Sequence, residues 1–323
     1  MTSAIQINQY GGSEVLTWVD VEIGQPAKGQ VRLKQVTSGL NFIDVYHRTG
    51  FYDLPLPLIP GVEGAGIVVA VGEGVTNFKN GDRVAYAGPI GSYAEERLID
   101  AEKLVKLPDE ISFEQASAIM LQGMTAQMLL RQTYNVKAGD TILVHAAAGG
   151  VGLIMCQWAA ALGATVIGTV STAEKAALAK ANGCHHPIIY TEQNFVEQVK
   201  TITDGQGLPV VYDGVGSTTF LDSLDCLQMR GTMVTFGQSS GPIEPLIPML
   251  LAQKGSLYLT RPVLFNYIAT SAQLETCATE LFDIIAAGKV QININQSFAL
   301  KDAGLAHQAL ESRKTTGSTI LIA

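Results

Sequence analysis

The stretch Ile142-Leu-Val-His-Ala-Ala-Ala-Gly-Gly-Val-Gly152 joins an apolar strand, a glycine-rich turn and the start of a helix. Gly149, Gly150 and Gly152 lack a Cβ, so the chain can turn sharply and the helix can pack closely on the strand. The N–H groups and the positive dipole end of that helix would face a phosphate. Ala147 replaces the first glycine of the G-x-G-x-x-G pattern, and such turns also occur without a ligand. The stretch predicts a dinucleotide site, and a purely structural turn remains the alternative.

Apolar strands alternate with helical segments from Thr141 onward, which is typical of parallel βαβ units. Strands are predicted over 141–145, 165–170, 187–190, 209–213, 232–236 and 257–260. Helices are predicted over 151–162, 173–182, 195–203, 218–228 and 245–253. Gly163, Gly183 and Gly231 fall just beyond these helices, where a left-handed cap is favourable. Six strands in this order predict a complete doubly wound Rossmann sheet.

The two ends of the chain have a different pattern. Residues 1–120 contain short apolar segments between Gly, Pro, Asn and Asp, including 30–36, 66–71 and 82–86, which suits an antiparallel sheet or partial barrel. After Pro262, a helix over 271–288, a strand over 292–298, a helix over 303–311 and a strand over 318–322 are too few to bury a core. This tail is therefore expected to return to the first segment. We predict an α/β protein with one discontinuous domain, residues 1–122 plus 262–323, and an inserted dinucleotide domain, residues 123–261.

Composition limits the possible partners. The chain has 323 residues, 47% of them apolar, and a formal net charge of −8 without a basic patch. Two cores are therefore feasible, and neither nucleic acid nor a membrane is an expected partner. The N-terminus has no basic region followed by an apolar run, so a soluble cytoplasmic protein is expected. Four widely spaced cysteines, with no C-x-x-C pair, are expected to be reduced packing residues: Cys156, Cys184, Cys226 and Cys277.

The end of the second Rossmann strand suggests which dinucleotide binds. An acidic residue there would accept a hydrogen bond from the ribose 2′-hydroxyl of NAD, but the sequence reads Thr169-Val-Ser-Thr172. Ser171 can donate a hydrogen bond, and Lys175 can meet a phosphate. We therefore predict a preference for NADPH over NADH. Glu174 lies beside Lys175, so an ordinary solvated Glu-Lys pair is the alternative.

Several segments together resemble the medium-chain dehydrogenase/reductase superfamily over the whole chain. Those common to the superfamily are Gly39-Leu-Asn-Phe-Ile-Asp44, Pro60-Gly-Val-Glu-Gly-Ala-Gly66, Asn80-Gly-Asp-Arg-Val84 and Ala146–Gly152. Three others look like the zinc-independent quinone oxidoreductases related to zeta-crystallin: Thr235–Gly241, Gln253–Pro262 and Glu311–Ser318. The resemblance implies a Rossmann domain inserted into a GroES-like partial β-barrel.

Metal chemistry is disfavoured within this superfamily likeness. The zinc alcohol dehydrogenases carry a Cys at the position matching Asn41 and a His at the position matching Val62, and neither residue present here is a credible zinc ligand. The segment 89–101 also lacks the cysteines of their structural zinc lobe. We predict no bound metal.

The resemblance also implies the residues that surround the reacting groups. Asn41, Phe42, Ile43, Asp44 and Tyr46 would lie beside the nicotinamide, with Asn41 and Asp44 holding polar groups of cofactor or substrate. Together with Tyr52, the polar members Asn41, Asp44 and Tyr46 are the predicted catalytic residues. The two tyrosines would cover an aromatic acceptor or donate hydrogen bonds to its developing oxyanion, and simple packing is the alternative.

Further cofactor contacts are expected by the same likeness. They are Thr125, Gly149, Gly150 and Val151 at the pyrophosphate; Ser171, Lys175 and Tyr190 at the adenosine phosphate; and Gly214, Phe236, Gln238, Ser239, Phe265 and Arg313 elsewhere along the cofactor. An exposed surface arginine is the alternative for Arg313. None of the five histidines is assigned to catalysis: His145 is expected to pack beside the turn, and Glu63 is expected to be a structural carboxylate.

The predicted function is NADPH-dependent quinone reduction by direct hydride or electron transfer without zinc. A quinone is already electron-poor, so it needs positioning more than activation. One alternative is a reductase of α,β-unsaturated aldehydes or ketones, and another is a non-catalytic NADPH- or RNA-binding protein. A homodimer is expected through the apolar edge Gly255–Thr260.

Overall fold

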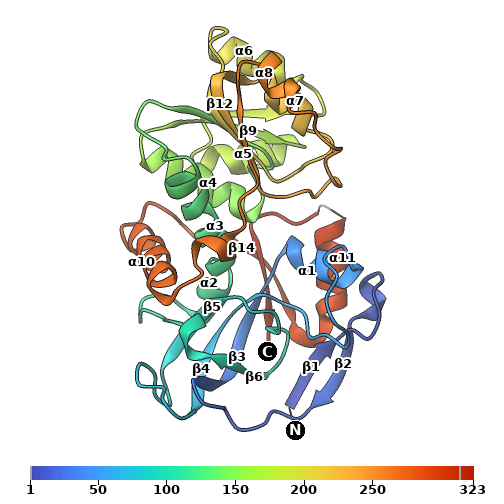
Figure 1. Cartoon of the computed structure of the whole chain (residues 1–323), viewed down its shortest axis with the longest axis vertical. Coiled ribbons are helices and arrows are strands. Elements are labelled where there is room, and N and C mark those ends of the chain that lie inside the picture. Colours follow the sequence, from blue (N-terminus) through green and yellow to red (C-terminus); the bar gives the residue numbers. More distant parts are fainter. Residues whose placement is uncertain (1, 313) are drawn as a thin grey trace. The chain divides into compact units, whose positions relative to one another are not determined.

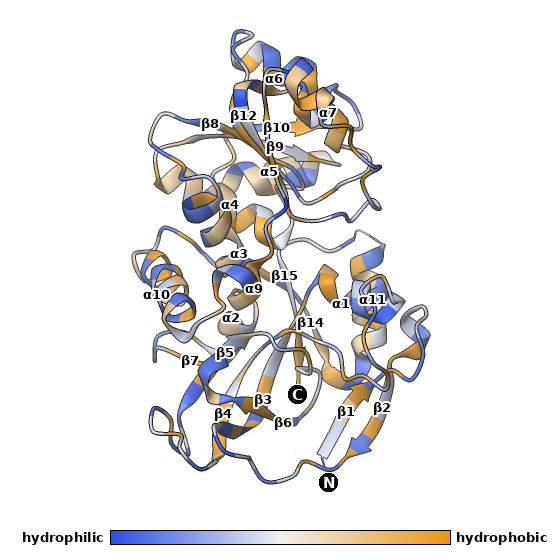
Figure 2. Ribbon diagram, viewed as in Figure 1, coloured by the Kyte–Doolittle hydropathy of each residue, from blue (hydrophilic) through white to orange (hydrophobic). Residues whose placement is uncertain are grey.

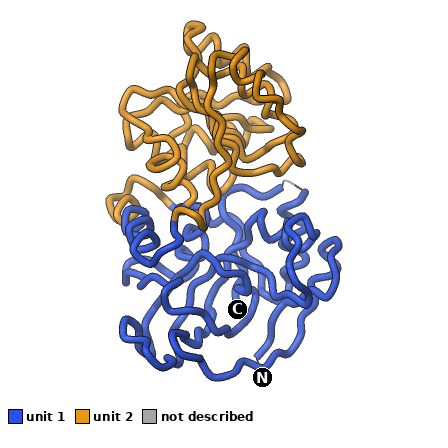
Figure 3. The backbone as a smooth tube through the Cα atoms, viewed as in Figure 1, with its two compact units in different colours: residues 1–124, 268–282, 292–323 blue, residues 125–267, 283–291 orange. Residues whose placement is uncertain are grey.

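A computed structural model describes residues 2–312 and 314–323 of the chain. These residues form two compact units, which Figure 3 colours separately. Unit 1 contains residues 1–124, 268–282 and 292–323, and unit 2 contains residues 125–267 and 283–291. The predicted domain boundaries at residues 122 and 261 stay predictions.

Unit 2 is built on a six-stranded parallel sheet with the order β10-β9-β8-β11-β12-β13. This is the doubly wound order, with the first strand beside the fourth. Its strands are β8 (Thr141–Val144), β9 (Thr165–Val170), β10 (His186–Ile189), β11 (Leu208–Asp213), β12 (Leu227–Thr235) and β13 (Tyr258–Thr260). Figure 2 shows strands such as β8 largely in the hydrophobic colour, as expected for a sheet covered on both faces. The predicted Rossmann sheet is confirmed.

Helices connect these strands and cover the sheet (Figure 1). They are α4 (Gly150–Ala161), α5 (Ala173–Ala181), α6 (Phe195–Ile202), α7 (Phe220–Leu224), α8 (Met249–Gln253) and α9 (Leu264–Tyr267), with a π-helical turn η3 (Met128–Thr133). Leu143, Ile167, Val211 and Met233 pack with helix residues such as Phe220 in one core cluster. Removing this apolar surface from water holds the helices on the sheet.

Two of the three predicted glycine caps are confirmed and one is wrong. Gly163 and Gly183 have φ angles of 85° and 88°, in the left-handed region. Gly231 lies instead inside β12, because α7 ends at Leu224, four residues earlier than predicted. The pairing of β11 with β12 shifts register between Leu208 and Val210, and Arg230 takes the positive φ of 60° at this irregularity.

Unit 1 contains a mostly antiparallel sheet with the order β14-β15-β3-β4-β5-β7, and β6 also pairs with β3. A separate hairpin pairs β1 with β2. The strands are β1 (Thr2–Gln6), β2 (Thr17–Val21), β3 (Gln30–Leu40), β4 (Glu63–Val71), β5 (Arg83–Ala87), β6 (Glu96–Asp100), β7 (Val105–Lys106), β14 (Ile294–Ala299) and β15 (Ser318–Ile322). Because β15 pairs with β3, the predicted return of the tail to the first segment is confirmed.

Short helices complete unit 1. They are α1 (Phe42–Thr49), α2 (Phe113–Ser117), α11 (Ala303–Glu311) and the 3-10 turns η1 (Ser13–Val15), η2 (Ala101–Lys103) and η4 (Leu300–Asp302). The helices α3 (Met120–Gln127) and α10 (Ser271–Ala286) each contribute residues to both units. None of the described helices is long and apolar enough to cross a membrane.

Candidate active site

Helix α1 carries most of the predicted acceptor-site residues. Asn41 precedes its first turn, and Asp44 in that turn accepts a hydrogen bond from the backbone N–H of Asn41 (2.9 Å). A carboxylate at this position is favourable because the first N–H groups of a helix have no partner within it. Phe42, Ile43 and Tyr46 follow on the same two turns, so this short segment positions the whole predicted group.

Four aromatic rings gather along α1 and the residues that follow it. We call this group, Phe42, Tyr46, Phe51 and Tyr52, the aromatic cluster. Its ring centroids lie 5.3 to 5.7 Å apart, and the rings of Tyr46 and Tyr52 meet edge to face. Phe51 and Tyr52 are exposed on the surface of the chain. The cluster therefore offers flat apolar faces of the kind that an aromatic ligand can stack against.

Asn41 and Glu63 form the centre of a buried polar network. The Asn41 amide nitrogen donates to Glu63 Oε2 (2.6 Å), and its amide oxygen accepts from Gln122 Nε2 (3.0 Å). Glu63 Oε1 accepts from the backbone N–H of Leu121 (2.7 Å), and Gln122 Oε1 accepts from the Ser318 hydroxyl (2.8 Å). We call Asn41, Glu63, Gln122 and Ser318 the Glu63 network. Glu63 is thus buried and hydrogen-bonded, as expected, and its purely structural role stays a prediction.

Burial controls the charge of this network. Glu63 is completely buried, and the resulting loss of hydration raises its pKa from about 4.5 to about 8, against the lowering effect of its hydrogen bonds. A Cβ on Gly39 would lie 2.3 Å from Glu63 Oε2 and 2.2 Å from the carbonyl oxygen of Ser117. Glycine at this position therefore leaves the space that the carboxyl group occupies.

The positions that match zinc ligands do not suit a metal in this chain. Both polar atoms of the Asn41 side chain are already paired within the Glu63 network, and Val62 presents only a buried apolar side chain. Within residues 2–312 and 314–323, no group of three or more His, Cys, Asp and Glu side chains is arranged to hold a metal ion. The four cysteines are free and buried, so they act as packing residues.

Asp44 is completely buried in unit 1. Its Oδ2 accepts a second hydrogen bond from the Tyr93 hydroxyl (3.0 Å), while Oδ1 has no partner in the described part of the chain. Desolvation raises the pKa of Asp44 to about 7, although the hydrogen bonds from Asn41 and Tyr93 lower it. Direct contact of Asp44 with cofactor or substrate therefore stays a prediction, and its surroundings favour an indirect role.

In unit 2, the glycine-rich turn leads directly from β8 into α4. Gly149 precedes the helix, and Gly150 and Val151 open a first turn that contains no acidic residue. A Cβ on Gly152 would lie 2.3 Å from the carbonyl oxygen of Ala146, so glycine is needed for this close approach. The unpaired N–H groups and dipole of α4 suit the pyrophosphate of a dinucleotide.

His145 directly follows β8, and its ring is buried and hydrogen-bonded, as expected. Its Nδ1 lies 2.8 Å from Thr169 Oγ1 and its Nε2 lies 2.8 Å from Ser223 Oγ. Burial lowers the pKa of His145, so the ring is neutral at physiological pH.

The predicted adenosine-phosphate residues come together at the ends of β9 and β10. Ser171 follows β9, and its carbonyl oxygen accepts from the Thr191 hydroxyl (3.1 Å). Tyr190 follows β10, is exposed, and donates its backbone N–H to Val170 (3.0 Å). Lys175 lies in the first turn of α5, where the Thr172 hydroxyl accepts its backbone N–H. The side chain of Glu174 bonds back to Thr172 and to its own N–H, which lowers the Glu174 pKa.

The ends of β11 and β12 form one continuous loop surface. Asp213 Oδ1 accepts the N–H groups of Val215 (2.7 Å) and Gly216 (3.1 Å). The carbonyl oxygen of Gly214 accepts the N–H of Ser239 (3.2 Å), and a Cβ on Gly214 would lie 3.1 Å from the Phe236 ring. The predicted contacts Gly214, Phe236, Gln238 and Ser239 are thus held next to one another within unit 2.

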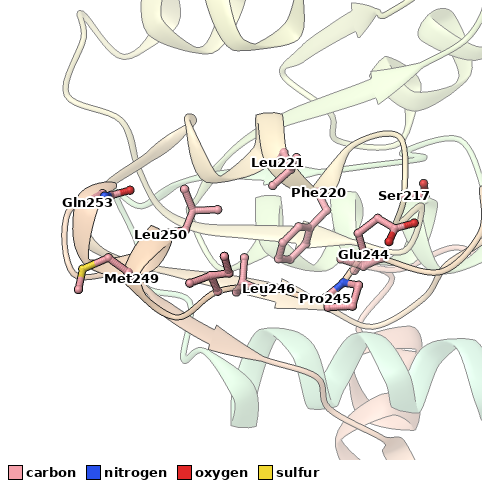
Figure 4. A pocket seen from close by; sticks show the side chains of 11 residues that line it. Ser217, Phe220, Leu221, Glu244, Pro245, Leu246, Met249, Leu250 and Gln253 are labelled. Carbon is pink, nitrogen blue, oxygen red and sulfur yellow. The ribbon is translucent and has the colours of Figure 1, made fainter.

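Two further predicted residues come from helices. Thr125 is a half-buried residue of α3 in unit 2, and Phe265 is a half-buried residue of α9. Arg313 lies outside the described residues. A cavity of about 480 Å³ in unit 2 is lined instead mainly by apolar side chains of α7, α8 and the segment before α8, including Leu221, Leu246 and Met249, with Ser217, Glu244 and Gln253 as its polar residues (Figure 4). None of the predicted cofactor residues lines it.

Sequence reasoning missed the buried partners of Asp44. Tyr93 and Arg48 were not singled out, and His307 was assigned no role, yet all three lie in one hydrogen-bonded group with Asp44. One signal was available: Asp44 and Arg48 are four residues apart on one helix face. The contacts with His307 span more than 200 residues and could not be read from spacing.

Comparison with known proteins agrees with this geometry. Residues 27–109 match the model of the alcohol dehydrogenase GroES-like domain, and residues 150–278 match the zinc-binding dehydrogenase model. A quinone oxidoreductase of Pseudomonas aeruginosa is 53% identical, and a 2-haloacrylate reductase of a Burkholderia species is 44% identical. The first alignment covers 100% of both chains, and the second covers 100% of this chain and 99% of the reductase.

A solved structure is similarly close. The Escherichia coli quinone oxidoreductase in complex with NADPH has a TM-score of 0.98 and is 49% identical, with 99% of this chain and 100% of that chain covered.

Proposed function

The chain belongs to the quinone oxidoreductases of the medium-chain dehydrogenase/reductase superfamily, and from this premise we propose that it reduces quinones with NADPH without zinc. The observation that carries the proposal is that one chain contains two prepared sites. Unit 2 has a phosphate-binding turn with Ser171 and Lys175 at the next strand end, and unit 1 has an aromatic cluster. The relatives named quinone oxidoreductase and the structure with NADPH support the same assignment.

The residues of unit 2 would bind and orient the dinucleotide. The N–H groups of Gly150 and Val151 would donate to the pyrophosphate at the N-terminus of α4. Ser171, Lys175 and Tyr190 would hold the 2′-phosphate, because a hydroxyl and an ammonium suit a dianion better than they suit a bare ribose hydroxyl. NADPH supplies the hydride when it is bound.

The aromatic cluster would receive the quinone. Stacking on Tyr52 and Tyr46 would hold a flat acceptor in place, and the Tyr46 hydroxyl would donate to the oxygen on which negative charge develops. Because a quinone is already electron-poor, holding it close to the hydride donor provides most of the catalysis. A Lewis acid is not required, and the paired amide of Asn41 is unsuited to hold one.

Reduction of an activated alkene is the second candidate. The 2-haloacrylate reductase of Burkholderia is 44% identical over the full chain, and its named substrate is an α,β-unsaturated acid. Its hydride acceptor is an electron-poor carbon, as in a quinone, so the two activities differ in the shape of the acceptor site rather than in the chemistry of the donor.

The assembly and the cellular location also belong to the proposal. Strand β13 is the last strand of the unit 2 sheet, and the side chain of Tyr258 on it is 62% exposed. Pairing of this edge with a second copy would cover it. It would also cover exposed apolar residues near the cavity of Figure 4, such as Ile247 and Met249. Four buried free thiols suit a reducing compartment, which supports a cytoplasmic location.

A parallel assay tests the proposal. Chelator-treated protein is mixed with NADPH or NADH and with a quinone, 2-chloroacrylate or an enone, and the loss of absorbance of the reduced nicotinamide is followed. We expect the fastest turnover with NADPH and the quinone. Turnover with only the alkene acceptors would establish the second candidate, and NADPH binding without turnover would indicate a non-catalytic protein.

A further inference from the structure

Arg48 is a buried arginine at the end of a row of hydrogen bonds that reaches Asp44. Its guanidinium donates to both carboxylate oxygens of Glu311 (2.7 and 2.8 Å) and to the carbonyl oxygen of Gly11 (3.2 Å). It also lies 3.2 Å from Nδ1 of His307. An arginine side chain has only donors and keeps its proton at any physiological pH. Nδ1 of His307 must therefore be the acceptor in this contact.

The protonation of His307 follows from this contact. A neutral imidazole that accepts at Nδ1 carries its proton at Nε2. Burial and the positive charge of Arg48 lower the pKa of His307 to about 3, so the ring stays neutral. Nε2 lies 3.2 Å from the Tyr93 hydroxyl oxygen, which therefore accepts the proton of His307. The planes of the Tyr93 and His307 rings are inclined at 88° in an edge-to-face contact, which holds this geometry.

The same direction of hydrogen-bond donation continues from Tyr93 to Asp44. Tyr93 has a single hydroxyl proton, and its oxygen already accepts from His307, so this proton is free to point toward Oδ2 of Asp44 at 3.0 Å. Burial raises the pKa of Tyr93 well above its usual value, so the hydroxyl keeps its proton. Each donor in the row thus points toward Asp44, and reversing the bond between His307 and Tyr93 would move the imidazole proton to Nδ1, against the guanidinium of Arg48.

We infer that Arg48, His307 and Tyr93 form a one-way hydrogen-bond chain that favours the carboxylate form of Asp44 and so fixes the N-terminal turn of α1. The carboxylate accepts the backbone N–H of Asn41, and that turn carries Phe42 and Ile43 of the predicted site. His307, Tyr93 and Arg48 are positioning residues, because they act through Asp44. The charge state of Asp44 is set by residues of unit 1, and it does not depend on which acceptor the enzyme uses.

The same chain is unsuited to conduct protons from solvent. Its outer end is the Arg48–Glu311 ion pair, and a guanidinium does not release a proton to the next group. Tyr93 donates to Asp44, Glu63 interacts with it electrostatically, and Arg48 and His307 lie on the other side of Tyr93. Glu63 is a competing acid, because ionised Asp44 raises its pKa. An experiment must therefore follow Asp44 itself.

The tautomer of His307 gives a test that is read on the wild-type protein. The ¹⁵N chemical shifts of its ring nitrogens can be recorded on labelled protein from pH 5 to 8, with His307→Asn used only for assignment. We expect a neutral ring with the proton on Nε2 throughout. A proton on Nδ1, or an imidazolium above pH 5, would overturn the inference.

The carboxyl carbon of Asp44 gives the second test. Protein labelled with [γ-¹³C]aspartate is titrated, with Asp44→Asn for assignment, and wild type is compared with Tyr93→Phe. We expect loss of the Tyr93 hydroxyl to raise the midpoint of Asp44 by about one pH unit, and we expect His307→Phe to raise it as well. An unchanged midpoint in both variants would contradict the inference.

Tyr86→Phe is the matched control for this titration. Tyr86 is equally buried in unit 1, and its hydroxyl accepts from Gln35 (2.7 Å) and Arg97 (3.2 Å), with no contact to Asp44. The control should leave the midpoint of Asp44 unchanged. An equal shift in Tyr86→Phe and Tyr93→Phe would mean that the chain acts only through general stability.

Discussion

The side-chain amide of Asn41 donates to the carboxyl group of Glu63 across 2.6 Å, and both side chains are buried. This contact ties the residue before α1 to the first residue of β4. It pairs a buried acid with the amide of Asn41, which by the superfamily likeness matches the position of a zinc-binding cysteine. The chemistry of this part of unit 1 is therefore governed by hydrogen bonds and desolvation.

Loss of the Asn41 amide should destabilise the protein. Asn41→Ala leaves Glu63 Oε2 and Gln122 Nε2 without a buried partner, so we expect the free energy of unfolding to fall by about 1–3 kcal/mol. Urea denaturation measures this change. Asn8→Ala, at an exposed asparagine, is the control and should have almost no effect. Equal stability of the two variants would show that the network contributes nothing.

Glu63 should make stability depend on pH. Its pKa is raised from about 4.5 to about 8 by burial, so the folded state binds more protons than the unfolded state between these values. The stabilisation is complete below about pH 4.5 and is lost as the pH rises toward 8. Glu63→Gln removes this titration, so the decline of melting temperature between pH 5 and 8 should be shallower in the variant. A decline as steep as in wild type would assign it to other groups, of which Asp44 is the first candidate.

Lys175 should discriminate between the two dinucleotides. Lys175→Ala removes a positive charge proposed to meet the 2′-phosphate, so we expect the Kd for NADPH to rise roughly tenfold and the Kd for NADH to stay unchanged. Isothermal titration calorimetry measures both. Lys180→Ala, at an exposed lysine in the last turn of the same helix, controls for net charge. A similar loss of affinity for NADH would refute the assignment.

Tyr52 should act through its ring. Tyr52→Phe keeps the stacking face, while Tyr52→Leu removes it, so only the second substitution should raise the KM for the quinone, by roughly three- to tenfold. The Kd for NADPH should not change in either variant. If Tyr52→Phe has the larger effect, the hydroxyl group rather than the ring is the contact.

The exposed edge strand should determine the oligomeric state. Tyr258→Asp places a charge on the edge of β13 and should convert a dimer into a monomer in sedimentation equilibrium. Leu305→Asp, at an apolar surface residue of α11 in unit 1 that is 57% exposed, should leave the mass unchanged. A wild-type monomer would remove the dimer from the proposal.

The fold could be predicted well where the sequence pattern was local and repeated along the chain. The alternation of apolar strands and helices defined the parallel sheet, and Gly163 and Gly183 were correctly predicted as caps. The prediction that Gly231 caps a helix was wrong, because the register shift between β11 and β12 is a tertiary feature that no local pattern records. Helix α8 starts later than predicted, at Met249 directly after Pro248, because proline suits the start of a helix and disrupts its interior.

The candidate site was predicted less completely. Motif resemblance indicated Asn41, Tyr46 and the glycine-rich turn, since these residues lie within short continuous segments. The residues hydrogen-bonded to Asp44 and Asn41, and His307 behind Tyr93, come from distant parts of the chain, so Tyr93, His307 and Gln122 became visible only in the folded chain. Burial of a polar residue is a property of the packed structure, and composition does not report it.

Transfer of deuterium from NADPH in metal-free enzyme tests the central claim most directly. Chelator-treated protein, shown by elemental analysis to lack zinc, is loaded with NADPH deuterated at either face of C4 and mixed rapidly with a quinone in a single turnover. We predict that oxidation proceeds without metal and is slowed by deuterium at one face only. Failure of the metal-free enzyme to oxidise NADPH, with recovery on addition of zinc, would contradict the account.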